Sequence, residues 1–115
     1  PGTQPGELAI PREVWRRWIA AIADAGFHAL RVYTVQMPVF NQELRAHNLA
    51  NPDRALYLVH GVWLAHDTFQ ATEDLFEPAL RARMRQDIRD AVAVVHGDAV
   101  LPARRGYASG RSMPT

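Results

Sequence analysis

The sequence contains no cysteine, which excludes disulfide bonds and thiolate metal sites. It contains no lysine either: all thirteen basic residues are arginine, a bias typical of genomes rich in G and C. It also lacks an apolar run of the ~20 residues that a membrane helix needs. We therefore expect no membrane-spanning segment in this chain, whereas none of these features indicates its compartment.

Charge of one sign is not in excess. Acidic and basic residues are interspersed and the net charge is +1, so the sequence does not predict a nucleic-acid partner. The hydrophobic fraction of 48% is typical of a globular chain, and 115 residues are enough for one domain. Because the sequence begins at Pro1 and not at a methionine, we expect it to be a piece of a longer protein.

Hydrophobic spacing and the positions of Gly and Pro divide the chain into three parts. Residues 1–9 predict an irregular lead-in, residues 10–97 a β/α domain, and residues 98–115 a tail rich in Gly, Pro and Arg. Within the domain, helical periodicity alternates with runs of β-forming residues. The predicted elements are a helix from Pro11 to Gly26, a strand over Phe27–Val35, a helix that ends near Leu49, a strand over Ala55–Leu64 and a helix from Pro78 to Gly97.

This helix–strand–helix–strand–helix order predicts an α/β fold with parallel strands, because a helical crossover joins the two strands. It is the repeating unit of a (β/α)8 TIM barrel, which takes about 250 residues. The chain therefore predicts a partial (β/α)8 barrel, or else a small α/β layer with open sheet edges. The second strand is nearly continuous in apolar residues, so we expect cover on both of its faces, and its Gly61 indicates a bulge or a close approach.

The first strand holds a charge between apolar neighbours. Arg31 lies between Leu30 and Val32, and the two-residue period of a strand places Arg31 and Tyr33 on one face. In one interpretation, Arg31 and Tyr33 lie at the carboxyl end of the strand and bind a carboxylate or sugar hydroxyls, as ligand sites of parallel α/β folds do. In the other, which the pattern alone favours, Arg31 extends from an edge strand into solvent and Tyr33 packs on a helix.

The end of the second strand offers further candidates. His60 is a candidate acid, base or hydrogen-bond donor, and Trp63 offers a flat face to a sugar ring or an apolar ligand. The alternatives are a structural histidine and a core tryptophan. His60, His66 and Asp67 match no metal-ligand spacing, so the sequence predicts no metal and no cofactor.

No catalytic motif accompanies these residues. The sequence has no Ser-centred elbow and no Gly-rich phosphate loop. The acids Glu73, Asp74 and Glu77 precede a helix, where they favour its positive end. We therefore assign no catalytic residue and no metal ligand, and all candidate site residues are assigned to substrate binding. They are Arg31, Tyr33, His60 and Trp63.

Three segments resemble the early part of TIM-barrel glycoside hydrolases: GFHALRVYT, PVFNQELRAHNLANPDRALYLVHGVWL and HGDAVLPARRGYASG. The resemblance covers most of Ile10–Gly110 and is closest to bacterial glycosidase-like proteins related to glycoside hydrolase families 2 and 5. It implies that the two strands are the second and third of the barrel, and that the partner is a carbohydrate. It also implies that Arg31 orients a nucleophilic carboxylate and that His60 and Trp63 line the substrate cleft.

The general acid and the nucleophile of that family are glutamates at the ends of the fourth and seventh barrel strands, which this chain does not reach. The resemblance therefore implies a fragment of a carbohydrate-metabolising hydrolase, which supplies cleft residues to the remainder of the barrel and does not cleave glycosides alone. The alternative is a stand-alone α/β binding or interaction module that forms homo-oligomers through open sheet edges. A third hypothesis is a small carboxylate-binding enzyme that uses Arg31 and His60.

Overall fold

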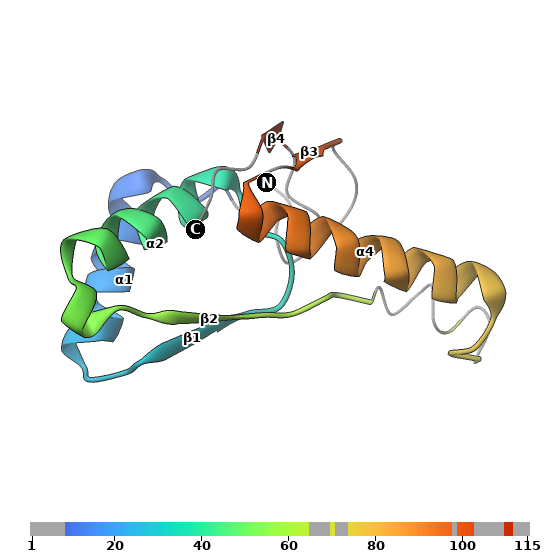
Figure 1. The fold of residues 1–115 in the computed structure, drawn as a ribbon, viewed down its shortest axis with the longest axis horizontal. Coiled ribbons are helices and arrows are strands. Elements are labelled where there is room, and N and C mark those ends of the chain that lie inside the picture. The colour runs from blue at the N-terminus through green and yellow to red at the C-terminus, as the bar shows by residue number, and fades with distance from the viewer. Residues whose placement is uncertain (1–8, 65–69, 71–73, 98, 103–109, 112–115) are drawn as a thin grey trace.

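The computed structural model describes residues 9–64, 70, 74–97, 99–102 and 110–111. The chain is a mixed α/β fold with helices and a two-stranded parallel sheet, and α1, β1, α2, β2 and α4 follow one another in the predicted order (Figure 1). The elements are α1 (Arg12–Asp24), β1 (Ala29–Val32), α2 (Pro38–Ala50), the 3-10 helix η1 (Pro52–Arg54), β2 (Tyr57–His60), α4 (Pro78–His96), β3 (Val100–Leu101) and β4 (Gly110–Arg111).

Helix α1 begins after a proline and ends before a glycine. Pro11 is extended, and its carbonyl accepts the N–H groups of Val14 and Trp15 at 3.1 and 3.2 Å. At the other end Gly26 has a φ of +83°, a left-handed conformation that glycine adopts without steric cost. Gly97 ends α4 in the same way, with a φ of +85°. The predicted glycine stops of both helices are therefore confirmed.

The strands β1 and β2 pair in parallel, with Val32 in register with His60. Each strand has four residues, which is shorter than predicted. Beyond the paired residues, the N–H of Gly61 donates to the carbonyl of Val32 at 2.8 Å. A Cβ atom on Gly61 would lie 2.8 Å from that oxygen and 2.9 Å from the carbonyl oxygen of Tyr33, so the predicted close approach is confirmed.

The helices α1 and α2 cover one face of the sheet (Figure 1). Trp15 of α1 contacts Phe40 of α2 at a distance of 4.9 Å between ring centres. Each large apolar side chain that is buried contributes roughly 1.5–3 kcal/mol, so this layer holds the first four elements together. The side chains that form the core of this layer are Ile19, Ala23, Val32, Phe40, Leu44 and Leu56.

The opposite face of the sheet is open. The prediction that the second strand is covered on both faces is wrong, because Tyr57 is 76% exposed and Val59 is 52% exposed. The alternate residue Leu58 packs against the α1–α2 core, as the two-residue period requires. Both faces of the strand are therefore apolar, but within the described residues it is the Leu58 face that packs in the core.

Helix α4 extends away from the α1–α2 layer (Figure 1). Near its carboxyl end, Val94 packs with Val35 and Ala99 in a second core made of smaller side chains. Further toward its start, Ile88 and Val92 are about half exposed. Neither α4 nor any other described helix combines the length and the apolar composition that a membrane crossing requires.

The predicted lead-in lies mostly outside the described residues, whereas the predicted tail contains two short strands. Residues 1–8, most of the predicted lead-in, lie outside the described residues. The predicted tail 98–115 contains β3 and β4, which pair in an antiparallel ladder. The sequence pattern did not indicate these strands, because a strand of two residues is too short to show a period.

Candidate functional site

Three of the predicted site residues meet on the open face of the sheet. The guanidinium carbon of Arg31 lies 5.0 Å from the centre of the Tyr33 ring, which is a cation–π geometry. The Tyr33 ring meets Trp63 edge to face, with 6.5 Å between the ring centres. Arg31 and Tyr33 are exposed and Trp63 is half-buried. We call Arg31, Tyr33 and Trp63 the aromatic row.

The local sequence explains why the aromatic row forms. Arg31 and Tyr33 are two residues apart at the carboxyl end of β1, so both side chains point away from the helices. Val59 is in register with Arg31, and Trp63 follows it by four residues, which keeps the same parity along the strand. Gly61 lets this part of the chain run close against the backbone of β1. A larger residue there would push the strand end, and Trp63 with it, away from Tyr33.

His60 does not join the aromatic row. It is in register with Val32, and alternation turns it to the face opposite Val59. Its Nδ1 donates to the carbonyl of Gly61 at 2.8 Å, which leaves Nε2 as the acceptor of the neutral ring. Burial lowers the pKa of His60, although that hydrogen bond acts in the opposite direction. The neutral imidazole is therefore the favoured form at neutral pH.

The surroundings of His60 belong to α4. A cavity of about 260 Å³ lies between the end of β2 and this helix. Its lining is apolar except for two imidazoles, and it includes His60, Val62, Ile88, Val92, Val95 and His96. The structure thus places His60 in a compartment separate from the other three predicted site residues.

A larger apolar cavity of about 330 Å³ lies between α1 and β1. Its lining includes three side chains of α1 and three residues of β1 or its end, which are Trp15, Trp18, Ile22, Leu30, Arg31 and Tyr33. Of the described residues that line this cavity, only Arg31 carries a charge. The cavity therefore adjoins the aromatic row through the two residues that they share.

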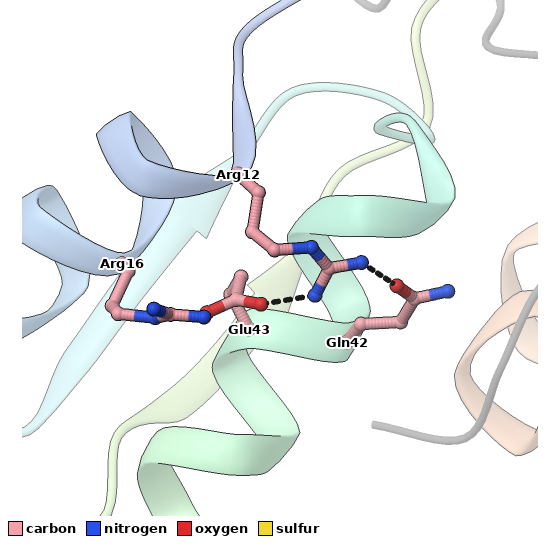
Figure 2. Close-up of polar contacts among 4 residues, drawn as sticks. All are labelled: Arg12, Arg16, Gln42 and Glu43. Atoms are coloured by element: carbon pink, nitrogen blue, oxygen red, sulfur yellow. Dashed lines mark hydrogen bonds and ion pairs between the residues drawn. The ribbon is translucent and has the colours of Figure 1, made fainter.

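A charged cluster around the buried carboxylate of Glu43 joins α1 to α2 (Figure 2). Glu43 is only 4% exposed and accepts hydrogen bonds from Arg12 and, at 2.9 Å, from Nε of Arg16. Arg12 also donates to the side-chain oxygen of Gln42. Both carboxylate oxygens of Glu43 are thus engaged by cations. The sequence analysis missed this cluster, because its partners are 27 and 31 residues apart and meet only when the helices pack.

The electrostatics of this cluster identify it as structural. Burial alone would raise the pKa of Glu43, but the hydrogen bonds and charges of Arg16 and Arg12 outweigh burial and lower that pKa. The hydrogen bond and charge of Glu43 in turn raise the pKa of Arg16. An ionised carboxylate held in this way has no proton to donate, so Glu43 is a tie between two helices and not a candidate general acid.

The acidic residues before α4 are also used structurally. The Glu77 side chain caps α4 by accepting the N–H of Leu80 at 2.8 Å, which confirms that this acid serves the helix start. Asp74 accepts the N–H of Phe76 at 2.8 Å. These contacts account for both carboxylates without a catalytic role.

The predicted absence of a metal motif concerned residues that are mostly not described. His66 and Asp67 lie outside the described residues, as does Glu73, one of the acids predicted to favour the start of a helix. Within the part of the chain that the structure describes, no three His, Asp or Glu side chains are grouped as a metal ion would require. The aromatic row therefore remains the group of side chains best suited to contact a ligand.

Comparisons with known proteins do not extend this picture. No protein-family model, no curated protein and no solved structure matches the chain. The functional argument therefore rests on the residues and on their geometry, above all on the aromatic row and on the parallel strands that carry it.

Proposed function

We propose that this chain is part of a (β/α)8 barrel of the glycoside-hydrolase type, and that its aromatic row lines a carbohydrate-binding cleft. The observation that carries the proposal is the asymmetry of the parallel sheet. The helices α1 and α2 cover one face, while Arg31, Tyr33 and Trp63 gather on the other. In a barrel the helices lie outside, so the face that they leave open is the one that turns toward the interior.

The position of the row along the strands supports the same proposal. Arg31 and Tyr33 lie at the carboxyl end of β1, and Trp63 lies beyond the carboxyl end of β2. Because the two strands are parallel, both ends meet at one edge of the sheet. Barrel enzymes bind their substrates at this edge.

The chemistry of the row suits a sugar. The rings of Tyr33 and Trp63 offer flat apolar surfaces to the C–H face of a pyranose, and the Arg31 guanidinium offers several N–H donors to hydroxyl or carboxylate oxygens. The described residues on this face include no acid. A pair of carboxyl groups is needed to cleave a glycosidic bond, so the role of this face is to bind and orient, and we expect no glycoside cleavage by these residues.

The test is a titration of the chain with β-linked and with α-linked disaccharides, in which backbone amide NMR shifts are measured at each step. We expect shift changes at residues of the aromatic row, no hydrolysis of aryl-glycosides, and an affinity at least about fivefold weaker in Trp63→Ala. Phe76→Ala is the matched control, because Phe76 is an aromatic residue that is 78% exposed and precedes α4, outside the two strands that carry the row. Equal losses in Trp63→Ala and Phe76→Ala, or shift changes that avoid β1 and β2, would contradict the proposal.

A further inference from the structure

The cavity between β2 and α4 lies on the helix-facing side of the sheet. His60 lines it from β2, on the same face as Leu58, which packs against the helices. Val62 lines it from just beyond the strand. Strands that complete a barrel pair with the edges of a sheet, so they do not enter a space between one face of the sheet and a helix. The cavity is therefore distinct from the sheet edges and from the aromatic row.

Helix α4 supplies the other wall of this cavity. Its lining residues recur at intervals of three and four, so they lie along one side of the helix. Ala91 is buried, whereas Ile88 and Val92 are about half exposed, so the cavity opens to solvent beside these two. A small molecule that enters there contacts branched aliphatic side chains. The residues of α4 that line the cavity are Ile88, Ala91, Val92, Val95 and His96.

The volume of the cavity limits the size of its occupant. The volume is about 260 Å³, whereas sites for drug-sized ligands measure roughly 300–1,000 Å³. An apolar cavity of about 150 Å³ is already large enough to hold benzene. The cavity therefore suits one ring with a short substituent. A rigid ring also loses less conformational entropy on binding than an alkyl chain of the same size.

His60 gives the cavity a hydrogen-bond acceptor. Its Nδ1 donates to the carbonyl of Gly61, so the unprotonated nitrogen of the neutral ring is Nε2, at the outer end of the imidazole. Burial lowers the pKa of His60, which favours this neutral form. The other imidazole, His96, is exposed. An apolar cavity with an acceptor favours a neutral hydroxyl over a carboxylate, because a carboxylate would lose its hydration against the apolar walls.

We propose that this cavity is a binding site for a neutral phenol, a single aromatic ring that carries one hydroxyl group. The ring packs against Val62 and Val92, and the hydroxyl donates to Nε2 of His60. The proposal does not rest on sugar binding, because the aromatic row is on the opposite face of the sheet. A phenol and a sugar therefore do not compete for the chain.

The experiment titrates the full chain with phenol, toluene and benzoate at neutral pH and follows the methyl and amide signals by NMR. We expect phenol to shift the methyl signals of Val62, Val92 and Val95. Benzoate should bind at least about tenfold more weakly than phenol, because its charge must leave water. Phenol shifts confined to other residues, or benzoate binding as tight as that of phenol, would overturn the proposal.

His60→Leu tests the hydrogen bond, and toluene is the reference ligand because it fills the same space without a hydroxyl. The ratio of phenol affinity to toluene affinity should be about tenfold lower in His60→Leu than in the wild type, since the hydroxyl loses its acceptor. His60→Gln supplies an amide oxygen and should restore part of this ratio. His28→Leu, which replaces an exposed histidine, should leave it unchanged. Equal ratios in the wild type and His60→Leu would overturn the proposal.

Ala91→Leu tests the cavity itself. It adds three carbon atoms at a position that is 7% exposed, and it should weaken phenol and toluene binding alike, by at least about fivefold. Circular dichroism checks that the variant is folded. Trp63→Ala, which changes the aromatic row, should leave phenol binding unchanged. Binding of both ligands to Ala91→Leu as tightly as to the wild type would contradict the site, and loss of phenol binding in Trp63→Ala would move the phenol to the aromatic row and overturn the proposal.

Discussion

The α1–β1–α2–β2 unit buries more large apolar side chains than the helix α4 does, where Leu80 is the largest buried apolar residue. In the first unit the fully buried side chains include Phe40, Ile19 and Leu44, and both helices contribute to one continuous core. In α4 the packed side chains near the carboxyl end are smaller, as Val94 shows, and the exposed apolar ones are larger, as Ile88 shows. Because hydrophobic stabilisation scales with buried area, most of it belongs to the first unit.

The polar contacts follow the same division. Glu43 ties α2 to α1 across 27 and 31 residues of sequence. The ion pair of Arg83 with Asp87 joins residues one turn apart within α4. A contact between distant segments stabilises the tertiary structure, whereas a contact within one turn stabilises the helix itself. The first unit is therefore the part of the fold that positions β1 and β2, and α4 is an addition to it.

The largest expected effect comes from opening the core of the first unit. Phe40→Ala should lower the free energy of unfolding by about 3–5 kcal/mol, because Phe40 is 2% exposed and the deletion leaves a cavity. Val94→Ala, in the core beside α4, should cost roughly 2 kcal/mol, since it removes two methyl groups. Urea unfolding followed by circular dichroism measures both. The comparison fails if Val94→Ala costs as much as Phe40→Ala.

The next effect in size concerns the tie between the helices of the first unit. Glu43→Gln keeps the shape of the side chain but removes its charge, and we expect a loss of about 1–3 kcal/mol in the free energy of unfolding. The control is Asp24→Asn, which removes an exposed partner of Arg54 at 2.6 Å and should cost less than about 1 kcal/mol. Equal losses in the two variants would show that burial adds nothing to the tie.

The pH dependence of the wild-type chain gives a second measurement of this tie. The pKa of Glu43 is lower in the folded chain than its ordinary value of 4.5, so the unfolded chain takes up the proton first as the pH falls. The stability that Glu43 contributes is therefore complete above about pH 4.5 and is lost below it, as the pH falls through the folded pKa. Glu43→Gln should flatten the loss of stability in that range. An unchanged slope would mean that other carboxyls cause it.

Helix ends and strand parity followed from the sequence because they obey local rules. Gly26 and Gly97 are the residues that adopt a left-handed φ most easily, and they ended the helices as predicted. The two-residue period placed Arg31 and Tyr33 on one face, where the structure finds them in contact. Such features need no knowledge of what packs on top. They were therefore within reach of pattern and propensity.

Features that depend on contacts between residues far apart in the sequence could not be predicted from the sequence pattern. The apolar run of the second strand predicted cover on both faces, but the cover of Val59 depends on what lies over it, which the strand does not encode. His60 and Trp63 are three residues apart, so alternation along an extended chain turns their side chains in opposite directions. The sequence did not indicate, however, that α4 packs beside His60 and forms a cavity with it. The tie at Glu43 required the packing of α1 on α2. In each case a contact far along the chain decided the outcome.

The smallest expected effect concerns the half-exposed side of α4, which also lines the cavity beside His60. Ile88→Gln and Val92→Gln replace side chains that are 47% and 55% exposed with a good helix former, so each should change the free energy of unfolding by no more than about 0.5 kcal/mol. Ile19→Gln in α1 is the matched contrast: it buries an amide at a position that is 1% exposed and should cost several times more. Urea unfolding at two protein concentrations measures all three. A loss above about 1.5 kcal/mol in Val92→Gln, greater at the higher concentration, would show that a second molecule covers this side of α4 in solution, and α4 would then be a structural element of the assembly and not an addition to the first unit.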